Sequence, residues 1–208
     1  MFNINWTDLL YTIPAVIIAL TFHEFAHAWM AYRFGDITAK QAGRLTLNPI
    51  KHLDVIGTLM LIFFRFGWAK PVPVNPFYFQ GNRERKMMFV SFAGPGINLL
   101  LAIISAGILS LFVHGLLPYN NYAYYFFNYF TQINVILAVF NLIPIPPLDG
   151  SKIIIGLFPS TAKVIHSFER FGFIILMLLI FTGIFSSVIS PIINGVYRLI
   201  LIITGLGS

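Results

Sequence analysis

The residues of this chain best suited to chemistry are His23, Glu24 and His27, which form the pattern His-Glu-x-x-His. Two histidines four residues apart lie one above the other on a helix, so both imidazoles can bind one metal ion. The glutamate between them lies close enough to take a proton from a water molecule at that metal. The surrounding segment is strongly apolar. Burying imidazoles and a carboxylate in such a segment costs free energy, so their presence indicates a function. We predict a zinc site in which His23 and His27 are ligands and Glu24 is the catalytic base.

The composition is that of an integral membrane protein. Hydrophobic residues make up 58% of the 208 residues, charged residues make up 10%, and the mean hydropathy is +0.82. The core of a soluble protein cannot absorb so much apolar surface. The chain has no cysteine, which excludes disulfides, cysteine-ligated zinc and a thiol nucleophile. Any metal must therefore be held by His, Asp or Glu.

The basic residues are concentrated in one part of the chain. The net charge of +6 could suggest a nucleic-acid partner, but nine of the thirteen basic residues fall in one stretch. They are Arg33, Lys40, Arg44, Lys51, Arg65, Lys70, Arg83, Arg85 and Lys86. In a membrane protein such clustering marks the cytoplasmic side. We therefore expect no nucleic acid as a partner and a lipid bilayer as the surroundings.

Four apolar segments are long enough to span a bilayer, and they predict an α-helical fold. They cover residues 9–32, 87–116, 124–143 and 168–189. Residues 191–205 could add a fifth, shorter helix. The second segment contains Gly94-Pro95-Gly96, which predicts a break whose freed backbone groups must be satisfied by neighbouring protein or water. We treat residues 1–208 as a single domain of four to five transmembrane helices.

The region between the first two spans has a different character. Residues 37–47 contain short extended patches around a glycine, and residues 70–76 contain three prolines, so the second stretch must be extended. We expect the two stretches to form a small β-hairpin or sheet at the membrane surface. Residues 55–66 lie between them and are apolar but short, which favours a re-entrant or interfacial segment over a full span.

Asp149 is the best candidate for the third ligand that a catalytic zinc ion needs. If the basic region is cytoplasmic, the first helix runs inwards, the second outwards and the third inwards again. Asp149, which follows the third helix, then reaches the same depth as His23 and His27, near the cytoplasmic side. Zinc lowers the pKa of a bound water molecule, and Glu24 could take its proton and pass it to the leaving amine.

These segments resemble the signature motifs of the site-2 proteases, a family of intramembrane zinc metalloproteases. The resemblance rests on His23-Glu24-x-x-His27 and on Asn141-x-x-Pro144 followed by Asp149-Gly150. It extends to the stretches 43–49, 70–76 and 94–95, and so covers most of the chain. It implies zinc bound by His23, His27 and Asp149, Glu24 as the base, and cleavage of a substrate's transmembrane segment near the cytoplasmic side.

The resemblance also implies partners. The substrate would be a transmembrane protein or peptide, which could pair in extended form with an edge strand from residues 70–76 or 37–47. The chain resembles a minimal, core-only member that has no room for a PDZ or CBS domain. A homo-oligomer or a regulatory membrane partner is left open. We expect the cell membrane of a bacterium or archaeon as the location.

Several residues have plainer interpretations. Asn141 could position the substrate by polarising the scissile carbonyl, but a side chain at a helix end can equally bond the local backbone. His52 could lie near the metal, although a hydrogen bond that stabilises its loop is the simpler role. His114 and His166 fit interfacial positions at the ends of spans. The alternative for the histidine pair is a buried cluster satisfied by hydrogen bonds, and for Asp149 a turn residue.

Two other functions are compatible with parts of the sequence. A membrane zinc transporter would need further His, Asp or Glu residues along its spans, and the chain has almost none beyond the cluster. A pseudoprotease would bind transmembrane helices without cutting them, but the proposed base Glu24 is intact.

Overall fold

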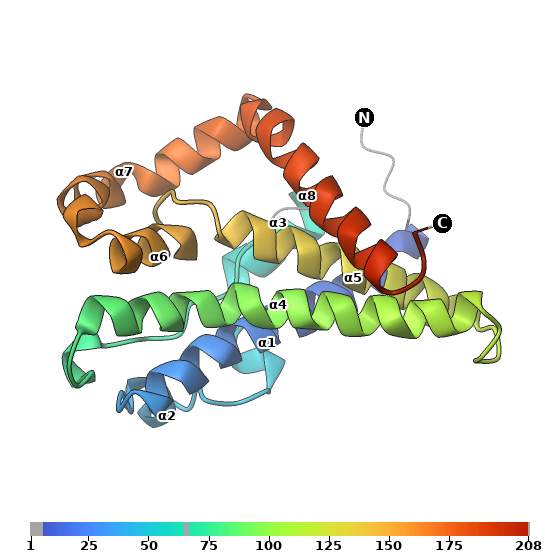
Figure 1. Cartoon of the computed structure of the whole chain (residues 1–208), viewed down its shortest axis with the longest axis horizontal. Helices are drawn as coiled ribbons and strands as arrows, with labels where there is room; N and C mark the ends of the chain where they lie inside the picture. The colour runs from blue at the N-terminus through green and yellow to red at the C-terminus, as the bar shows by residue number, and fades with distance from the viewer. Residues whose placement is uncertain (1–5, 65–66, 208) are drawn as a thin grey trace.

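One long helix, α4 (Arg83–Val113), contacts most of the other long helices. The computed structural model describes residues 6–64 and 67–207. The other α-helices within these ranges are α1 (Trp6–Arg33), α2 (Thr38–Gln41), α3 (Val55–Phe64), α5 (Asn121–Asn141), α6 (Asp149–Leu157), α7 (Ala162–Phe181) and α8 (Ile184–Ile203). Figure 1 shows α4 running along the molecule beside α1 and α5, and α4 also contacts α6.

The polar residues that start α4 and α5 explain where these helices begin. The side chain of Asn82 accepts a hydrogen bond from the backbone N–H of Arg85, and Asn120 accepts one from Ala123. Each asparagine thereby satisfies a backbone donor that the first helical turn leaves free.

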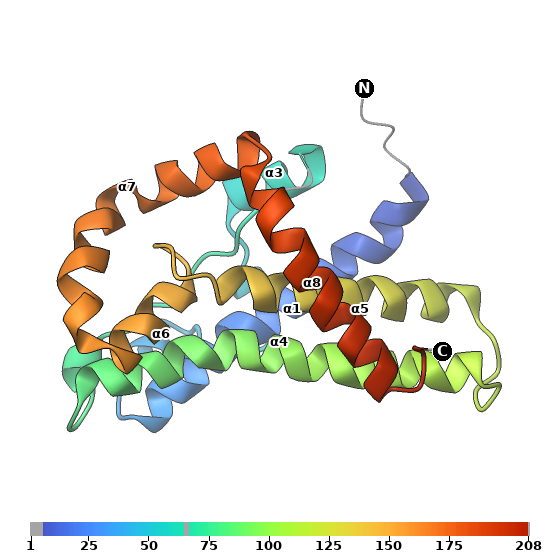
Figure 2. The same cartoon turned by 45° about the horizontal axis from the view of Figure 1, so that its top comes forward.

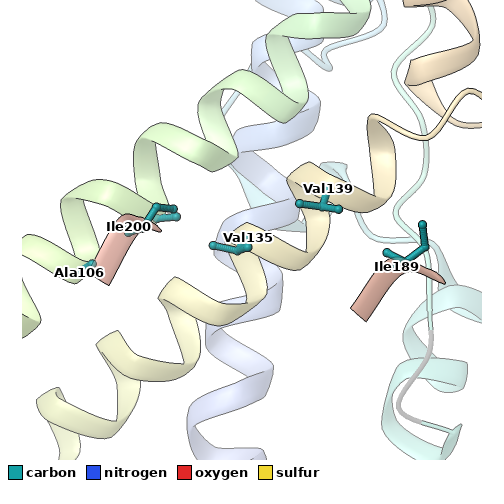
Figure 3. Packing of buried hydrophobic residues seen from close by; sticks show 6 residues of the cluster. Ala106, Val135, Val139, Ile189 and Ile200 are labelled. Carbon is teal, nitrogen blue, oxygen red and sulfur yellow. The ribbon is translucent and has the colours of Figure 1, made fainter. Parts of the chain in front are cut away.

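Small residues let the helices approach closely. Ala102 and Ala106 of α4 pack with Val135 and Val139 of α5 in one buried cluster, which Ile189 and Ile200 of α8 complete (Figure 3). A second cluster joins Ala15 and Ala19 of α1 to Phe130 of α5. Close packing of small side chains is the usual way in which helices associate in a membrane, where lipid removes most of the hydrophobic drive.

The last two helices form an arch. Figure 2 shows α7 leaving α6 at one end of the molecule and α8 returning across α5. The bend lies at Gly183, whose φ of 75° is left-handed and ends one helix before the next begins. The predicted span 168–189 is therefore wrong, because it divides between α7 and α8. Residues 191–203 lie in α8, so a fifth long helix does form within the described residues, but it begins earlier than expected, at Ile184.

The predicted break at Gly94-Pro95-Gly96 does not form. Residues Arg83–Val113 are helical throughout, and Pro95 is buried. A proline removes one backbone donor and crowds the preceding turn, but packing against neighbouring helices can hold such a helix together.

The predicted β-hairpin is not confirmed. Within the described residues the structure contains one isolated bridge, Leu53 to Ala69, and no β-strand. Part of the 37–47 stretch forms α2, and residues 70–75 are outside any helix but join no ladder. The reason lies in the prolines, since Pro71 and Pro73 have no N–H to offer a neighbouring strand.

The short apolar segment forms the ten-residue helix α3, and positions 65–66 of that prediction lie outside the described residues. Ten residues reach about 15 Å, roughly half the hydrocarbon thickness. This length agrees with a segment that does not span the membrane.

Two helices in the described part of the chain are long and apolar enough to cross a membrane, Leu9–Arg33 and Arg83–Val113. The expected number of four to five spans is therefore not confirmed. Large apolar side chains such as Leu10, Leu100 and Ile104 are exposed on these two helices. Exposed apolar surface on long helices agrees with contact to lipid.

Candidate metal centre

The structure brings the three predicted ligands together. His23 and His27 lie one turn apart on α1, with their Nε2 atoms 2.9 Å apart. The Oδ2 atom of Asp149, at the start of α6, lies 3.3 Å from Nε2 of His23 and 3.1 Å from Nε2 of His27. They are the one group in the described residues whose ligand atoms could hold a metal ion. Both histidines are buried.

The hydrogen bonds of the Nδ1 atoms determine which tautomer each neutral imidazole adopts, and so whether Nε2 has a lone pair for a metal ion. Nδ1 of His27 lies 2.7 Å from the backbone carbonyl oxygen of Val90. A carbonyl oxygen only accepts, so Nδ1 must carry a hydrogen, and in the neutral imidazole Nε2 then presents a lone pair. Nδ1 of His23 is held in the same way, 2.6 Å from Oδ1 of Asn98.

The donor set fits a zinc ion. Two imidazole lone pairs and a carboxylate oxygen converge on one point, and such atoms repel one another unless a cation lies between them. Two histidines and one acidic residue make a typical catalytic zinc site, because a fourth position stays open. The polar-cluster alternative would need a protonated imidazole that donates its Nε2 hydrogen to Asp149, whereas neutral imidazoles with these tautomers present lone pairs to a metal ion.

A glycine of α4 makes room for the pair. A Cβ atom at Gly94 would lie 2.4 Å from Nε2 of His27 and 2.6 Å from Cε1 of His23. Real Cβ atoms do not approach other atoms so closely, so only glycine fits beside the imidazoles. Gly94 of the Gly-Pro-Gly sequence, which we interpreted as a helix break, therefore allows the close approach of α4 to α1.

The turn before α6 carries Asp149 to the histidines. Asp149 is the first residue of α6, where the partial positive charge of the helix end stabilises a carboxylate. A Cβ atom at Gly150 would lie 2.3 Å from the carbonyl oxygen of Leu142 and 2.4 Å from that of Ile143. The chain can thus fold back closely on the end of α5 only with a glycine here. Asp149 is more than a turn residue, because its carboxylate faces both imidazoles.

Glu24 faces the same cavity but bonds a different element. Its Oε2 atom accepts a hydrogen bond of 2.8 Å from the backbone N–H of Val72. Val72 lies in residues 70–75, which we call the proline-rich segment. Its position next to His23 and its buried carboxylate agree with the predicted role of a base.

The proline-rich segment is held in place at both ends. The backbone N–H of Lys70 donates to the carbonyl oxygen of His52 at 2.9 Å, and the Arg44 guanidinium donates to the carbonyl oxygen of Lys70. At the other end the N–H of Asn75 donates to Oδ2 of the fully buried Asp36 at 2.7 Å. The loop after α1 therefore positions the segment that contacts Glu24.

A cavity of about 630 Å³ opens onto this group. Its polar lining is His23, Glu24, His27, Ser91, Asn141, Asp149 and Lys152. Apolar residues make most of the wall, with Pro71 and Val72 from the proline-rich segment and Phe173, Leu176 and Met177 from α7. A few polar groups in an apolar pocket is the usual composition of a substrate site.

The other predicted residues lie as follows. Asn141 lines the cavity, and its Nδ2 donates to the carbonyl oxygen of Leu137 at 2.9 Å, so neither of its two interpretations is eliminated. His52 is buried and bonds the carbonyl oxygen of Thr46 at 2.7 Å, which supports the loop role. His114 contacts Ser110 and His166 contacts Glu169 at 3.1 Å. Both are exposed, and neither belongs to the metal group.

Three contributors were not identified from the sequence as parts of the site. These are Asn98, Gly94 and the carbonyl group of Val90. For Asn98 there was a signal, since an amide in the middle of an apolar helix is expensive. A backbone carbonyl leaves no such signal, because every residue has one.

Comparison with known proteins finds one family. The sequence profile described as peptidase family M50 matches residues 11–121 and 117–183. The candidate zinc metalloprotease YwhC of Bacillus subtilis (strain 168) is 44% identical over 191 residues, which cover 89% of this chain and 86% of that protein.

More distant relatives carry similar names. The candidate zinc metalloprotease Rip2 of Mycolicibacterium smegmatis is 33% identical over 179 residues, covering 82% of this chain and 66% of that protein. The candidate zinc metalloprotease MJ0611 of Methanocaldococcus jannaschii is 27% identical over 154 residues, covering 72% of this chain and 73% of that protein. No solved structure has significant similarity to the chain.

Gly94→Ala should weaken zinc binding, because the added methyl group would displace the imidazole of His27. We expect the zinc dissociation constant to rise by at least about 10-fold, the lower end of the effect of disturbing a ligand's surroundings. Chelator competition on the purified protein in detergent measures this constant. Gly107→Ala is the matched control on the same helix, since a Cβ atom there meets nothing within 4 Å. Equal zinc affinity in the two variants would contradict the packing argument.

Asp149→Ala should lower zinc affinity more than Gly94→Ala does, because it removes one of the three proposed ligands. The loss should exceed the roughly 10- to 100-fold that follows removal of an outer hydrogen-bond partner. Metal analysis of the purified variant gives the zinc content per chain. Glu169→Ala serves as the control, because this exposed acid pairs with His166 and not with the metal group. Undiminished zinc in Asp149→Ala would remove this residue from the ligand set.

Proposed function

Because the chain belongs to peptidase family M50, we propose that it is a zinc-dependent intramembrane endopeptidase that hydrolyses peptide bonds in or near transmembrane segments of membrane proteins. Family membership and the names of its relatives support a zinc metalloprotease. The observation that carries the proposal is the convergence of His23, His27 and Asp149 beside Glu24 in one cavity. Two helices long and apolar enough to span a membrane support its intramembrane character.

The roles of the residues follow from their positions. His23, His27 and Asp149 would hold the zinc ion, which when bound supplies Lewis acidity and makes water more acidic. Glu24 would accept one proton from the attacking water and deliver it to the leaving amine. The reaction consumes one water molecule, whose oxygen ends on the acyl carbon as the C–N bond breaks. The Val72 N–H holds the Glu24 carboxylate at the cavity wall.

The cavity limits the form of the substrate. One turn of helix, about 10 Å wide and 5.4 Å long, already occupies about 400 Å³. A cavity of about 630 Å³ would therefore hold a segment of a few residues and not a whole transmembrane helix. Such a segment could lie along the proline-rich segment and donate hydrogen bonds to its carbonyl groups, as an added strand does. Asn141 would face the same peptide.

The charge distribution supports a cytoplasmic active site. The basic residues between Arg33 and Lys86 border the end of α1 that carries His23 and His27 and the start of α4. Basic residues near span ends favour the cytoplasmic side. The zinc-transporter alternative is weaker, because the described residues offer one metal group and no series of such groups along a path.

Glu24→Gln should abolish hydrolysis and leave zinc bound, because the amide cannot accept the proton but is not a ligand. We expect at least about a 100-fold loss, the lower range for general acid–base catalysis. The chain is expressed in a host that lacks it, and new peptide termini within membrane proteins are identified by mass spectrometry.

The comparison of variants makes this experiment decisive. Termini that appear with the native chain and are missing with Glu24→Gln would support the proposal. Termini that appear equally with both would contradict it. Val74→Ala is a useful control, because it alters the cavity lining without changing any proton-transfer group.

The absence of cysteine allows the orientation to be tested directly. Lys51 and Leu116 are exposed and lie on the two sides expected from the charge distribution. We expect a membrane-impermeant maleimide to label Lys51→Cys in inside-out vesicles and Leu116→Cys in intact cells. The reverse pattern would place the metal centre near the outer side.

A further inference from the structure

A chain of buried amides lies directly behind His23. Asn98 of α4 and Asn134 of α5 are both fully buried. Nδ2 of Asn98 donates to Oδ1 of Asn134 at 2.8 Å and to the carbonyl oxygen of Ala19 at 3.3 Å. Nδ2 of Asn134 donates in turn to the carbonyl oxygen of Phe130 at 2.8 Å. This series of hydrogen bonds ends at His23, whose Nδ1 lies 2.6 Å from Oδ1 of Asn98.

Two backbone carbonyl groups set the direction of every bond in this chain. A carbonyl oxygen cannot donate, so the NH₂ group of Asn134 must face Phe130 and its oxygen must face Asn98. For the same reason the NH₂ group of Asn98 must face Ala19, which turns its oxygen towards His23. An amide oxygen also only accepts, and therefore Nδ1 of His23 must be the donor.

The tautomer of His23 follows from this direction. With the hydrogen on Nδ1, the neutral imidazole has its lone pair on Nε2, the atom that faces His27 and Asp149. In the other tautomer, two acceptors would face each other at 2.6 Å, and a buried pair of that kind is strongly unfavourable. Reversing the amides would only move the conflict to Ala19 and Phe130.

We propose that Asn98, oriented by Asn134 and the carbonyl of Ala19, is a positioning residue that fixes the tautomer and ring plane of His23 for zinc binding. This inference rests on the proposed function, because it assumes that zinc is the ion held by the site. His27 is fixed by a backbone carbonyl, which no substitution of a side chain at Val90 removes. Asn98 is therefore a side chain whose substitution removes the hydrogen bond that holds a ligand without changing the ligand itself.

A structural role is the alternative that the test must separate. Hydrogen bonds between α1, α4 and α5 could simply hold the helices together. The same pair of helices has a second buried bond of this kind, between Ser105 of α4 and Thr131 of α5 at 2.7 Å. Neither hydroxyl contacts the metal group, so Ser105→Ala reports the loss of a bond between the helices alone.

The experiment compares the zinc affinity of Asn98→Leu, Asn98→Asp and Ser105→Ala with that of the native chain. Affinity is measured by chelator competition on full-length protein in detergent, and folding is followed by the thermal midpoint. We expect Asn98→Leu to weaken zinc binding by about 10- to 100-fold, as loss of a ligand's hydrogen-bond partner usually does. Ser105→Ala should bind zinc as the native chain does.

Asn98→Asp distinguishes positioning from packing. A carboxylate accepts the Nδ1 hydrogen of His23 as the amide oxygen did, but it cannot donate to Ala19 or Asn134. Positioning therefore predicts that Asp restores most of the affinity that Leu loses. A structural role predicts the opposite order, because an unpaired charge between helices costs more than an apolar side chain.

The visible spectrum of the Co²⁺-loaded protein gives a second readout. We expect Asn98→Leu to change the ligand-field bands and Ser105→Ala to leave them unchanged. Native zinc affinity in folded Asn98→Leu would overturn the inference, as would equal losses in Asn98→Leu and Ser105→Ala. If Asn98→Asp does not fold, the comparison of Leu with Ser105→Ala decides alone. Peptide hydrolysis is not measured here, so retained cleavage by Glu24→Gln would refute the proposed mechanism and leave this inference standing.

Discussion

The convergence of three electron-pair donors on one point is the constraint on which this structure depends. Nε2 of His23, Nε2 of His27 and Oδ2 of Asp149 lie between 2.9 and 3.3 Å from one another. Such atoms repel one another unless a positive charge lies among them, and burying them between apolar helices adds a cost that neighbouring groups must offset. The close approach at Gly94, the tight turn at Gly150 and the amide chain behind His23 all serve this one point.

Local patterns explain how much of this arrangement could be read from the sequence. The spacing of His23, Glu24 and His27 predicts a shared face because helical periodicity is a local property. Counting the predicted spans places Asp149 at the same membrane depth as the two histidines, because the bias of basic residues sets the direction of each span. The first three long helices were predicted within a few residues, because long apolar runs are strong signals.

The remaining features depend on contacts that no local pattern contains. Gly94-Pro95-Gly96 suggested a break in the helix. The structure instead shows that Gly94 has no side chain because the histidines of another helix, α1, occupy that space. The bend at Gly183 was hidden in an apolar run that looked continuous. The hairpin failed because residues 70–75 find their partners in the loop after α1, on Asp36, Arg44 and His52, and not in a second strand.

The hydrogen bond from the N–H of Val72 to Glu24 connects the proposed catalytic base to the wall of the cavity. Pro71 and Pro73 offer no amide hydrogen, so neither neighbour of Val72 could replace its N–H as the donor to Glu24. A displacement of this backbone would move the N–H that holds the carboxylate. In the proposed mechanism, where the peptide lies along residues 70–75 and Glu24 is the base, this bond links peptide binding to proton transfer. A peptide that fits poorly along the wall would then also displace the carboxylate.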